Sequence, residues 1–313
     1  MTLRVTFLGT SAAIPTVARN PSGIFINREG DQLLFDAGEG TQRQMMRYGT
    51  GFGVSAVFVT HLHGDHVLGL PGLLQTWAFT ERSAPVTIVA PAGTVGQLRE
   101  YLFSLEQPPD YPVTIEPVEP GDIAMSGDGY EVRVFETDHK TRSVGYALVE
   151  DERKGRFDRE KAESLGVPVG PLFSKLHRGE AVTLEDGTEI RPEQVVGPPR
   201  PGRTVVYTGD TRPTDLVVTA AADADLLIHD GTFVSDHRDR ARETAHATAR
   251  EAGEIAAEAG VRQLVLTHIS SRYPGEATDH HEEASAIFDG KVIVARDGLE
   301  LDVPYPDTNR SGQ

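Results

Sequence analysis

The sequence contains no cysteine, and this absence excludes several kinds of chemistry. Disulfide bonds, zinc sites with thiolate ligands and a cysteine nucleophile all need a residue that this 313-residue chain lacks. The chain also has no apolar run of about eighteen residues, the length that a membrane-spanning helix requires. Its N-terminal apolar stretch is too short for a signal peptide and is predicted as a first strand. We therefore expect a cytoplasmic protein with no membrane partner.

Positive charge is scarce as well. The chain has 30 Lys and Arg residues against 47 Asp and Glu residues, so its formal net charge is −17. Lysine is especially rare and occurs only at Lys140, Lys154, Lys161, Lys175 and Lys291. An acidic, lysine-poor surface suits concentrated salt, because ions screen the self-repulsion, and this composition favours a halophilic source over an ordinary acidic protein. The acidity argues weakly against a nucleic-acid partner, since net charge does not describe local patches.

Short apolar runs alternate with helix-like stretches along the whole chain, and predicted strands outnumber predicted helices. This order predicts an α/β protein in which two sheets pack on each other with helices outside. Both halves have the same texture, so we expect residues 1–313 to form a single compound domain. One of the predicted helices is long and covers residues 238–259.

Residues 151–203 differ from the rest of the chain. This segment is rich in glycine and proline, has little periodicity, and carries the densest basic cluster in the sequence. A segment of this length without regular structure is usually functional or a mobile insertion. The alternative is a solvated loop.

The strongest chemical signal is the segment THLHGDH at residues 60–66, which follows an apolar strand at residues 56–59. In an extended chain, residues two apart point the same way, so His61 and His63 are predicted to converge on one metal ion. The turn at Gly64 would then direct Asp65 and His66 towards a second ion.

Two ions need further ligands, and three other predicted strands each end in a histidine or aspartate. These residues complete one set for each ion, with one carboxylate bridging the two: His61, His63 and His139; Asp65, His66 and His268; and Asp210 between them. Imidazole and carboxylate ligands suit Zn²⁺, and Mn²⁺ or Fe²⁺ would fit a similar set. Two ions about 3.5–4 Å apart activate a shared water and stabilise an in-line displacement, which favours hydrolysis of a phosphodiester.

The segment HLHGDH at residues 61–66, together with His139, Asp210 and His268, resembles the metallo-β-lactamase superfamily and, within it, the ribonuclease Z family. Further segments match that family at residues 36–42, 15–20 and 166–172, and the resemblance covers nearly the whole length. It implies an αβ/βα four-layer sandwich with an inserted flexible arm at roughly 151–203.

The resemblance also implies an activity. Members of this family are zinc-dependent endoribonucleases that remove the 3′ trailer from precursor tRNA, leaving a tRNA 3′-hydroxyl and a trailer 5′-phosphate. It implies two Zn²⁺ per subunit, a homodimer, and an arm that grips the tRNA across the dimer interface. By the same resemblance the substrate-binding residues would be Arg19, Asn20, Lys175 and Arg178.

The catalytic residues implied by the resemblance are Asp65, which helps to deprotonate or orient the attacking water, and His246, which protonates the leaving oxygen. Read from the pattern alone, His246 lies inside the predicted helix at residues 238–259. The family usually has a glutamate where this chain has Asp230, so the role of Asp230 in orienting His246 is an open question. His229 is either catalytic or buried. His237, His280 and His281 are predicted to be solvated.

Two other functions are compatible with parts of the pattern. A small-molecule hydrolase of the same superfamily, such as a phosphodiesterase or a lactonase, would use the same ligands but would not need the arm. A non-catalytic RNA-binding protein would use the metal structurally, but structural zinc sites are closed four-ligand arrangements and do not match this ligand set.

Overall fold

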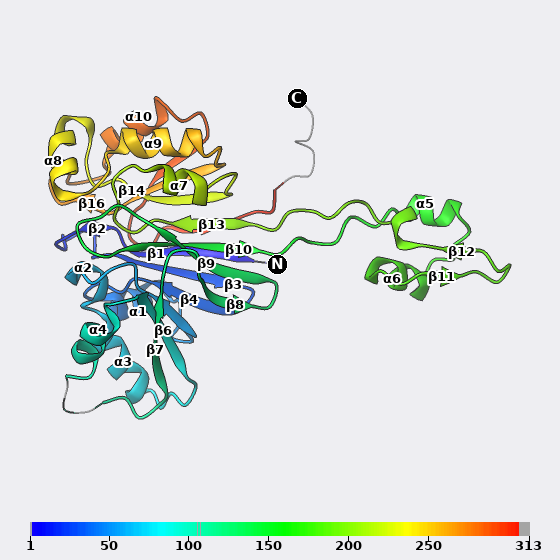
Figure 1. Cartoon of the computed structure of the whole chain (residues 1–313), viewed down its shortest axis with the longest axis horizontal. Helices are drawn as coiled ribbons and strands as arrows, with labels where there is room; N and C mark the ends of the chain where they lie inside the picture. The colour runs from blue at the N-terminus through cyan, green and yellow to red at the C-terminus, as the bar shows by residue number, and fades with distance from the viewer. Residues whose placement is uncertain (1, 105, 107, 307–313) are drawn as a thin grey trace. The chain divides into compact units, whose positions relative to one another are not determined.

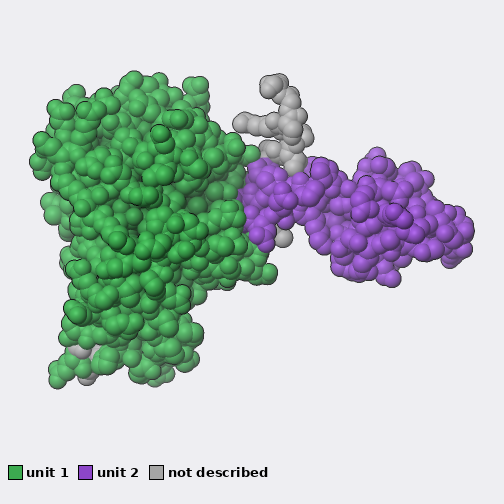
Figure 2. Space-filling model, in the orientation of Figure 1, with its two compact units in different colours: residues 1–149, 204–304 green, residues 150–203, 305–313 purple. Residues whose placement is uncertain are grey.

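The computed structural model describes residues 2–104, 106 and 108–306. Within that part of the chain, no helix combines the length and the apolar character needed to cross a membrane. The chain divides into two compact units, which are coloured separately in Figure 2. Unit 1 consists of Met1–Val149 and Thr204–Pro304, and unit 2 of Glu150–Arg203 and Tyr305–Gln313.

Unit 1 is built on two seven-stranded sheets. The first sheet has the order β18-β1-β3-β4-β5-β6-β7, with strands β1 (Leu3–Gly9), β3 (Gly23–Arg28), β4 (Asp31–Phe35), β5 (Ala56–Phe58), β6 (Val86–Pro91), β7 (Val113–Val118) and β18 (Glu300–Asp302). The second has the order β17-β15-β14-β13-β10-β9-β8, with strands β8 (Ile123–Gly127), β9 (Tyr130–Glu136), β10 (Val144–Glu150), β13 (Thr204–Tyr207), β14 (Leu226–Asp230), β15 (Gln263–Thr267) and β17 (Lys291–Val294).

Helices cover the outer face of each sheet, so that unit 1 has four layers (Figure 1). The first sheet carries α1 (Thr41–Tyr48), α2 (Gly64–Val67), α3 (Leu70–Phe79) and α4 (Val95–Leu102). The second carries α7 (Asp215–Ala220), α8 (Arg238–Thr244), α9 (Ala249–Glu258) and α10 (Thr278–Ser285), with a short 3₁₀ turn at Ser235–His237. The αβ/βα sandwich expected from the sequence is confirmed.

Three hydrophobic clusters hold these layers together. The central cluster lies between the sheets and joins side chains of both, such as Phe7, Phe58, Tyr146 and Val205. A second packs the first sheet against its helices, and a third packs the second sheet against α7, α9 and α10. Because both faces of each sheet are buried, strands such as β5 are apolar at every position, as is typical of parallel strands covered on both sides.

Parallel strands place the loops that follow them at one edge of each sheet. In the first sheet β4, β5 and β6 run parallel, and in the second β13, β14, β15 and β17 do. Two short strands at this edge, β2 (Ser11–Ala12) and β16 (Ile269–Ser270), pair with each other and connect the halves of unit 1. The carboxyl ends of parallel strands are where α/β sheets form their sites.

The prediction of one long helix at residues 238–259 is wrong. Helix α8 ends at Thr244, and Ala245 follows it in the left-handed conformation with φ 63°. Helix α9 starts afresh at Ala249, where the side chain of Thr248 accepts a hydrogen bond from the backbone of Glu251 and Glu251 caps Thr248 in return. The spacing Thr-x-x-Glu at residues 248–251 is a helix-start signal that the periodicity obscured. His246 therefore lies in a loop between two helices.

Unit 2 contains more regular structure than its composition predicts. Two helices, a small hairpin and a 3₁₀ turn occupy it: α5 (Arg159–Ser164), α6 (Pro171–Arg178), β11 (Val182–Thr183), β12 (Glu189–Ile190) and Pro192–Gln194. Ala162, Val167, Leu176, Val182 and Ile190 form its own small core. At the ends of the segment, Glu150 and Arg203 form a buried ion pair with Nη2–Oε1 at 2.7 Å, and the ring of Tyr305 packs on the Arg203 guanidinium.

Candidate active site

The predicted ligands come together at the edge of unit 1 where the parallel strands end. The segment after β5 carries His61 and His63, and helix α2 begins at the next residue and presents Asp65 and His66. Asp210 follows β13 and His268 follows β15, as the ends of neighbouring parallel strands require. His139 lies between β9 and β10. A glycine is needed at position 209, because its φ is 60° and a Cβ there would lie 2.8 Å from Thr60 Cβ.

The first cluster consists of His61, His63, His139 and Asp210, whose ligand-type atoms all lie within 4.8 Å of one another. Nε2 of His61 is 2.9 Å from Nδ1 of His63, and Nε2 of His139 is 3.2 Å from that same atom. Oδ2 of Asp210 lies 3.6 Å from His61 Nε2. Three imidazole nitrogens and a carboxylate oxygen thus face a common point.

The second cluster consists of Asp65, His66 and His268 and is buried beside the first. Oδ2 of Asp65 lies 3.1 Å from Nε2 of His268 and 3.6 Å from Nε2 of His66. Asp210 reaches this cluster as well, because its Oδ1 is 3.3 Å from both of those imidazole nitrogens. The two oxygens of Asp210 therefore face different clusters, which is the arrangement that a bridging carboxylate requires.

Hydrogen bonds on the side away from the clusters orient three of the imidazole rings. Nδ1 of His139 donates to the carbonyl oxygen of Ala245 at 2.8 Å, which leaves its Nε2 lone pair directed into the first cluster. Nδ1 of His66 donates to Oδ2 of Asp36 at 2.8 Å, and Nδ1 of His268 lies 2.9 Å from Oγ1 of Thr232. Such outer partners are typical of histidines that hold a metal, because they fix the tautomer and raise the basicity of the ligand nitrogen.

The charges of the site are strongly coupled. Burial opposes ionisation of Asp210, but His268 and His66 lower its pKa well below the ordinary value. Burial lowers the pKa of His66, yet Asp210, Asp36 and Asp65 together raise it well above the ordinary value. The pKa of His61 is lowered by burial and by His66, so this imidazole is neutral. The carboxylates of the site thus favour positive charge nearby, although His61 remains neutral.

The donor set fits divalent cations. Nε2 of His66 and Oδ1 of Asp210 are buried, and although they lie 3.3 Å apart, neither forms a hydrogen bond within the described residues. Unpaired buried polar atoms are costly unless a ligand satisfies them. Histidine nitrogens with carboxylate oxygens, and no sulfur, are the ligands that Zn²⁺, Mn²⁺ and Fe²⁺ accept.

His246 stands at the mouth of the same site. Its Nδ1 donates to Oδ2 of Asp230 at 2.8 Å, so the shorter side chain of Asp230 still reaches this histidine. The other oxygen of Asp230 accepts from the backbone and hydroxyl of Thr232 at 2.9 and 2.7 Å, which fixes the carboxylate in place. Burial lowers the pKa of His246, but Asp230 outweighs this and raises it to about 9. A protonated imidazole is therefore available beside the clusters.

Three backbone positions around the site adopt the left-handed conformation without being glycine. Asp36, Ala245 and His268 have φ values of 55°, 63° and 59°. Conformations of this kind are costly for residues with a Cβ and often occur at functional sites, where the surrounding structure enforces them. Sequence reasoning did not assign Asp36 to the site, although the segment at residues 36–42 was singled out. Its position directly after the apolar strand β4 was the available signal.

The residues predicted to bind substrate fall in two places. Arg19 is only 6% exposed, and its guanidinium donates to Oγ1 of Thr10 and to the carbonyl oxygen of Ala295. The side chain of Asn20 donates to the carbonyl oxygen of Glu39. Their hydrogen bonds hold loops of unit 1 together, whatever their role towards substrate. Lys175 and Arg178 lie on helix α6 of unit 2, with exposed side chains.

Of the remaining histidines discussed above, two are buried and two are exposed. His229 is fully buried, and its Nδ1 lies 2.7 Å from the carbonyl oxygen of Asp230. His237 and His281 are exposed as expected. The expectation that His280 is solvated is wrong, because it is fully buried in helix α10 against the ring of Tyr273. The acidic residues around it in the sequence suggested a solvated turn, whereas helix α10 buries His280 together with Ala284.

Comparisons with known proteins agree with this geometry. Residues 17–228 match the family model of the metallo-beta-lactamase superfamily. Two proteins named ribonuclease Z are similar over almost the whole length: one from Natronomonas pharaonis is 60% identical, covering 98% of this chain and all of that protein, and one from Halobacterium salinarum is 62% identical, covering 99% and all of it. The solved structure of the short form of human tRNase Z matches with a TM-score of 0.70 and 26% identity, covering 96% of this chain and 99% of that one.

Proposed function

The chain belongs to the ribonuclease Z family of the metallo-β-lactamase superfamily, and we propose on this premise that it is a metal-dependent endoribonuclease that removes the 3′ trailer from precursor tRNA. One observation carries the proposal. Asp210 lies between two clusters of histidine and carboxylate ligands, and a hydrogen-bonded His246–Asp230 pair stands beside them. This arrangement supplies both a place for two cations and a proton for a leaving group.

The metal ligands in this proposal are the seven residues predicted from the sequence. His61, His63 and His139 would hold one ion, Asp65, His66 and His268 would hold the other, and Asp210 would supply a ligand to each. We propose two Zn²⁺ per subunit, with Mn²⁺ or Fe²⁺ as alternatives that the same ligands accept. Two such ions would lower the pKa of a shared water and neutralise charge that develops on the phosphodiester.

In this proposal His246 and Asp65 carry out the proton transfers of the hydrolysis. Hydrolysis forms a bond from water oxygen to phosphorus and breaks the bond from phosphorus to the 3′ oxygen of the tRNA. His246 donates its Nε2 proton to that departing oxygen, while Asp230 holds the ring by Nδ1 and keeps it charged before the step. Asp65 orients or deprotonates the attacking water. The cut falls after the discriminator nucleotide and leaves a 3′-hydroxyl on the tRNA and a 5′-phosphate on the trailer.

Unit 2 is the tRNA-binding arm in this proposal. Its helix α6 presents Lys175 and Arg178 to solvent at the end of an amphipathic helix whose Leu176 is buried. Basic side chains on an exposed helix face are suited to contact phosphates of a folded RNA. We further propose that the enzyme acts as a homodimer in the cytoplasm, and that Arg19 and Asn20 shape the loop along which the RNA passes.

A small-molecule metallo-hydrolase remains the alternative activity, and unit 2 argues against it. A phosphodiesterase or lactonase would have no use for a separately folded unit with its own core and exposed basic residues. A decisive comparison uses two substrates, a 3′-extended tRNA and bis(p-nitrophenyl) phosphate. The double variant K175Q/R178Q should lose most cleavage of the tRNA and retain hydrolysis of the small phosphodiester.

A matched control for that comparison is R159Q/K161Q, which removes the same charge from helix α5 of the same unit. If the two double variants and the wild type cleave the tRNA equally well, the arm does not bind it by these residues. If the wild type hydrolyses only the small substrate, the proposed function is wrong and the small-molecule alternative replaces it.

A further inference from the structure

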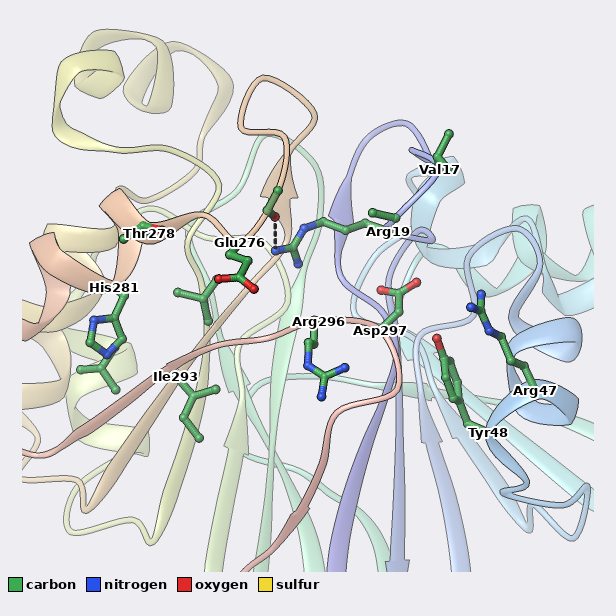
Figure 3. Close-up of a pocket in the computed structure, with 14 residues that line it drawn as sticks. Val17, Arg19, Arg47, Tyr48, Glu276, Thr278, His281, Ile293, Arg296 and Asp297 are labelled. Atoms are coloured by element: carbon green, nitrogen blue, oxygen red, sulfur yellow. Dashed lines mark hydrogen bonds between the residues drawn. The ribbon is translucent and has the colours of Figure 1, made fainter.

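Apart from the candidate active site, unit 1 has a cavity at the side of the sandwich where strand β17 and helix α1 end. Its volume is about 710 Å³, within the range of sites that hold a nucleotide-sized ligand. Figure 3 shows the residues that line it, among them Arg47 and Tyr48 on one side and Ile293 and His281 on the other. None of the residues proposed above as metal ligands lines this cavity.

Two arginines in the cavity have no anionic partner. Arg47 and Arg296 form no ion pair or side-chain hydrogen bond with any residue that the structure describes, and both are exposed. Other exposed arginines of the chain do pair with carboxylates, as Arg4, Arg133 and Arg159 do. Guanidinium groups bind phosphate through paired hydrogen bonds, so two unpaired ones in a cavity are suited to a phosphate-bearing ligand.

The acidic residues of the cavity do not cancel this charge. Asp297 accepts hydrogen bonds from Oγ1 of Thr10, the backbone N–H of Asn20 and Nε2 of Gln44, so its carboxylate is committed to the protein. Burial raises the pKa of Asp297 above its ordinary value. Glu276 lines the opposite side and is exposed.

The cavity also offers surfaces for a base. The hydroxyl of Tyr48 has no hydrogen-bond partner in the described chain, and its ring lies between Arg47 and the centre of the cavity (Figure 3). The ring cannot move towards the neighbouring loop, because it already lies close to the backbone of Gly298. Val17 and Ile293 add apolar surface. An aromatic ring beside unpaired guanidinium groups is the usual composition of a site for single-stranded nucleic acid.

Hydrogen bonds connect Arg19 and Asp297, which line the cavity, to loops of the proposed metal centre. Arg19 and Asp297 both bond to Oγ1 of Thr10, and the carbonyl oxygen of Thr10 accepts from the N–H of Ile269, the residue after His268. A few residues further along the same loop, the N–H of Ala13 donates to Oδ2 of Asp65 at 2.7 Å. A chain lying in the cavity would therefore be held next to the loops that shape the candidate active site.

We propose that this cavity binds a single-stranded stretch of the RNA substrate next to the cleaved bond, with backbone phosphates on Arg47 and Arg296 and a base against Tyr48. The inference rests on the proposed function and adds a binding site to it. It requires only phosphates and a base, which every nucleotide of an RNA supplies, so the site would bind without reading sequence.

The test measures steady-state cleavage of a 3′-extended tRNA by the intact metal-loaded enzyme. In the double variant R47Q/R296Q, KM should rise about 10-fold while kcat changes less than about 2-fold, because two phosphate contacts are lost without any change at the reacting atoms. The control R99Q/R250Q removes the same charge from two exposed helix positions and should leave KM unchanged. Y48L changes no charge and should raise KM by about 3- to 10-fold.

Each outcome decides a different point. If R47Q/R296Q matches its control, the inference is wrong while the proposed function stands, provided that the wild type cleaves the tRNA. If the wild type does not cleave it, the proposed function fails first. Binding of free AMP is measured in parallel. AMP binding that R47Q/R296Q abolishes, with no change in KM for the tRNA, would show a site for free nucleotides and overturn the proposal.

Discussion

The carboxylate of Asp36 accepts a hydrogen bond from Nδ1 of His66 at 2.8 Å, and the same oxygen accepts from the hydroxyl of Tyr207 at 2.8 Å. Asp36 follows β4 of the first sheet, whereas Tyr207 ends β13 of the second. A third donor, Oγ1 of Thr60, lies 2.9 Å away. The imidazole of His66 is thus oriented by a buried carboxylate that also joins the two sheets.

This relationship predicts the effect of Asp36→Asn. The backbone N–H of Thr60 donates to the other oxygen of Asp36 at 2.8 Å, so the carboxylate accepts from four donors. The variant removes the charge that holds His66 and leaves these four donors competing for one amide oxygen, so the affinity for the second metal ion should fall about 10- to 100-fold. The measurement is metal content by elemental analysis during titration with a chelator. Tyr207→Phe removes a single donor and serves as the control, with a smaller loss. Equal metal retention by Asp36→Asn and the wild type would contradict this role.

A second prediction concerns His246. Replacing it by alanine removes the proton donor without touching the proposed ligands, so single-turnover cleavage should slow by about 10²- to 10⁴-fold. Metal content and the midpoint of thermal unfolding should stay at the wild-type values. His237→Ala, at an exposed histidine before helix α8, should cleave at nearly the wild-type rate. A His246→Ala enzyme that retains full activity would remove His246 from the mechanism.

The sequence was sufficient to predict the four-layer fold and to single out seven ligand-type residues that lie close together in the structure, because their signals are local. Apolar runs ending in His61, Asp210 or His268 identify strand ends, and parallel strands bring those ends together. The interactions that the sequence could not reveal are long-range. The contact of His139 with Ala245, 106 residues away, and that of Thr232 with His268 depend on how the loops fold over the site.

The regular structure of unit 2 could not be predicted from the sequence for a different reason. Its helices are six and eight residues long and its strands two, too short for periodicity to emerge among many glycines and prolines. The small core around Leu176 becomes evident only once the segment is folded. His280 was missed for a similar reason, since its neighbours in the sequence are acidic while tertiary packing alone buries it.

Burial of His280 predicts a dependence of stability on pH. Burial lowers the pKa of His280 to about 4, against the ordinary value of 6.5 for an unfolded chain. Between these two values the unfolded chain binds a proton that the folded chain excludes, so the free energy of unfolding should fall as the pH drops from about 6.5 to about 4. The slope from this residue is at most about 1.4 kcal/mol per pH unit.

Denaturant unfolding at pH 7 and pH 5, in the same salt, measures this slope. His280→Leu should show a smaller loss of stability between the two pH values than the wild type shows. His281→Leu, at the exposed neighbour, should keep the wild-type slope. The same slope in His280→Leu and the wild type would show that His280 does not titrate as its burial implies.

The net charge of −17 predicts a dependence on salt. Self-repulsion among acidic side chains is screened in concentrated salt and strengthens when ions are removed, so the protein should stay folded in molar KCl and lose structure on dialysis to low salt. Circular dichroism before dialysis, after it and after return to KCl separates reversible unfolding from aggregation. An unchanged spectrum and melting temperature at low salt would contradict the halophilic interpretation.

The most direct test of the central claim is cleavage of a 3′-extended tRNA transcript by the intact enzyme, with the product ends mapped at nucleotide resolution. We expect one cut next to the discriminator nucleotide, with a 3′-hydroxyl on the tRNA, abolished by a chelator and restored by Zn²⁺ or Mn²⁺. Absence of cleavage under conditions in which the same preparation hydrolyses a small phosphodiester would contradict the claim.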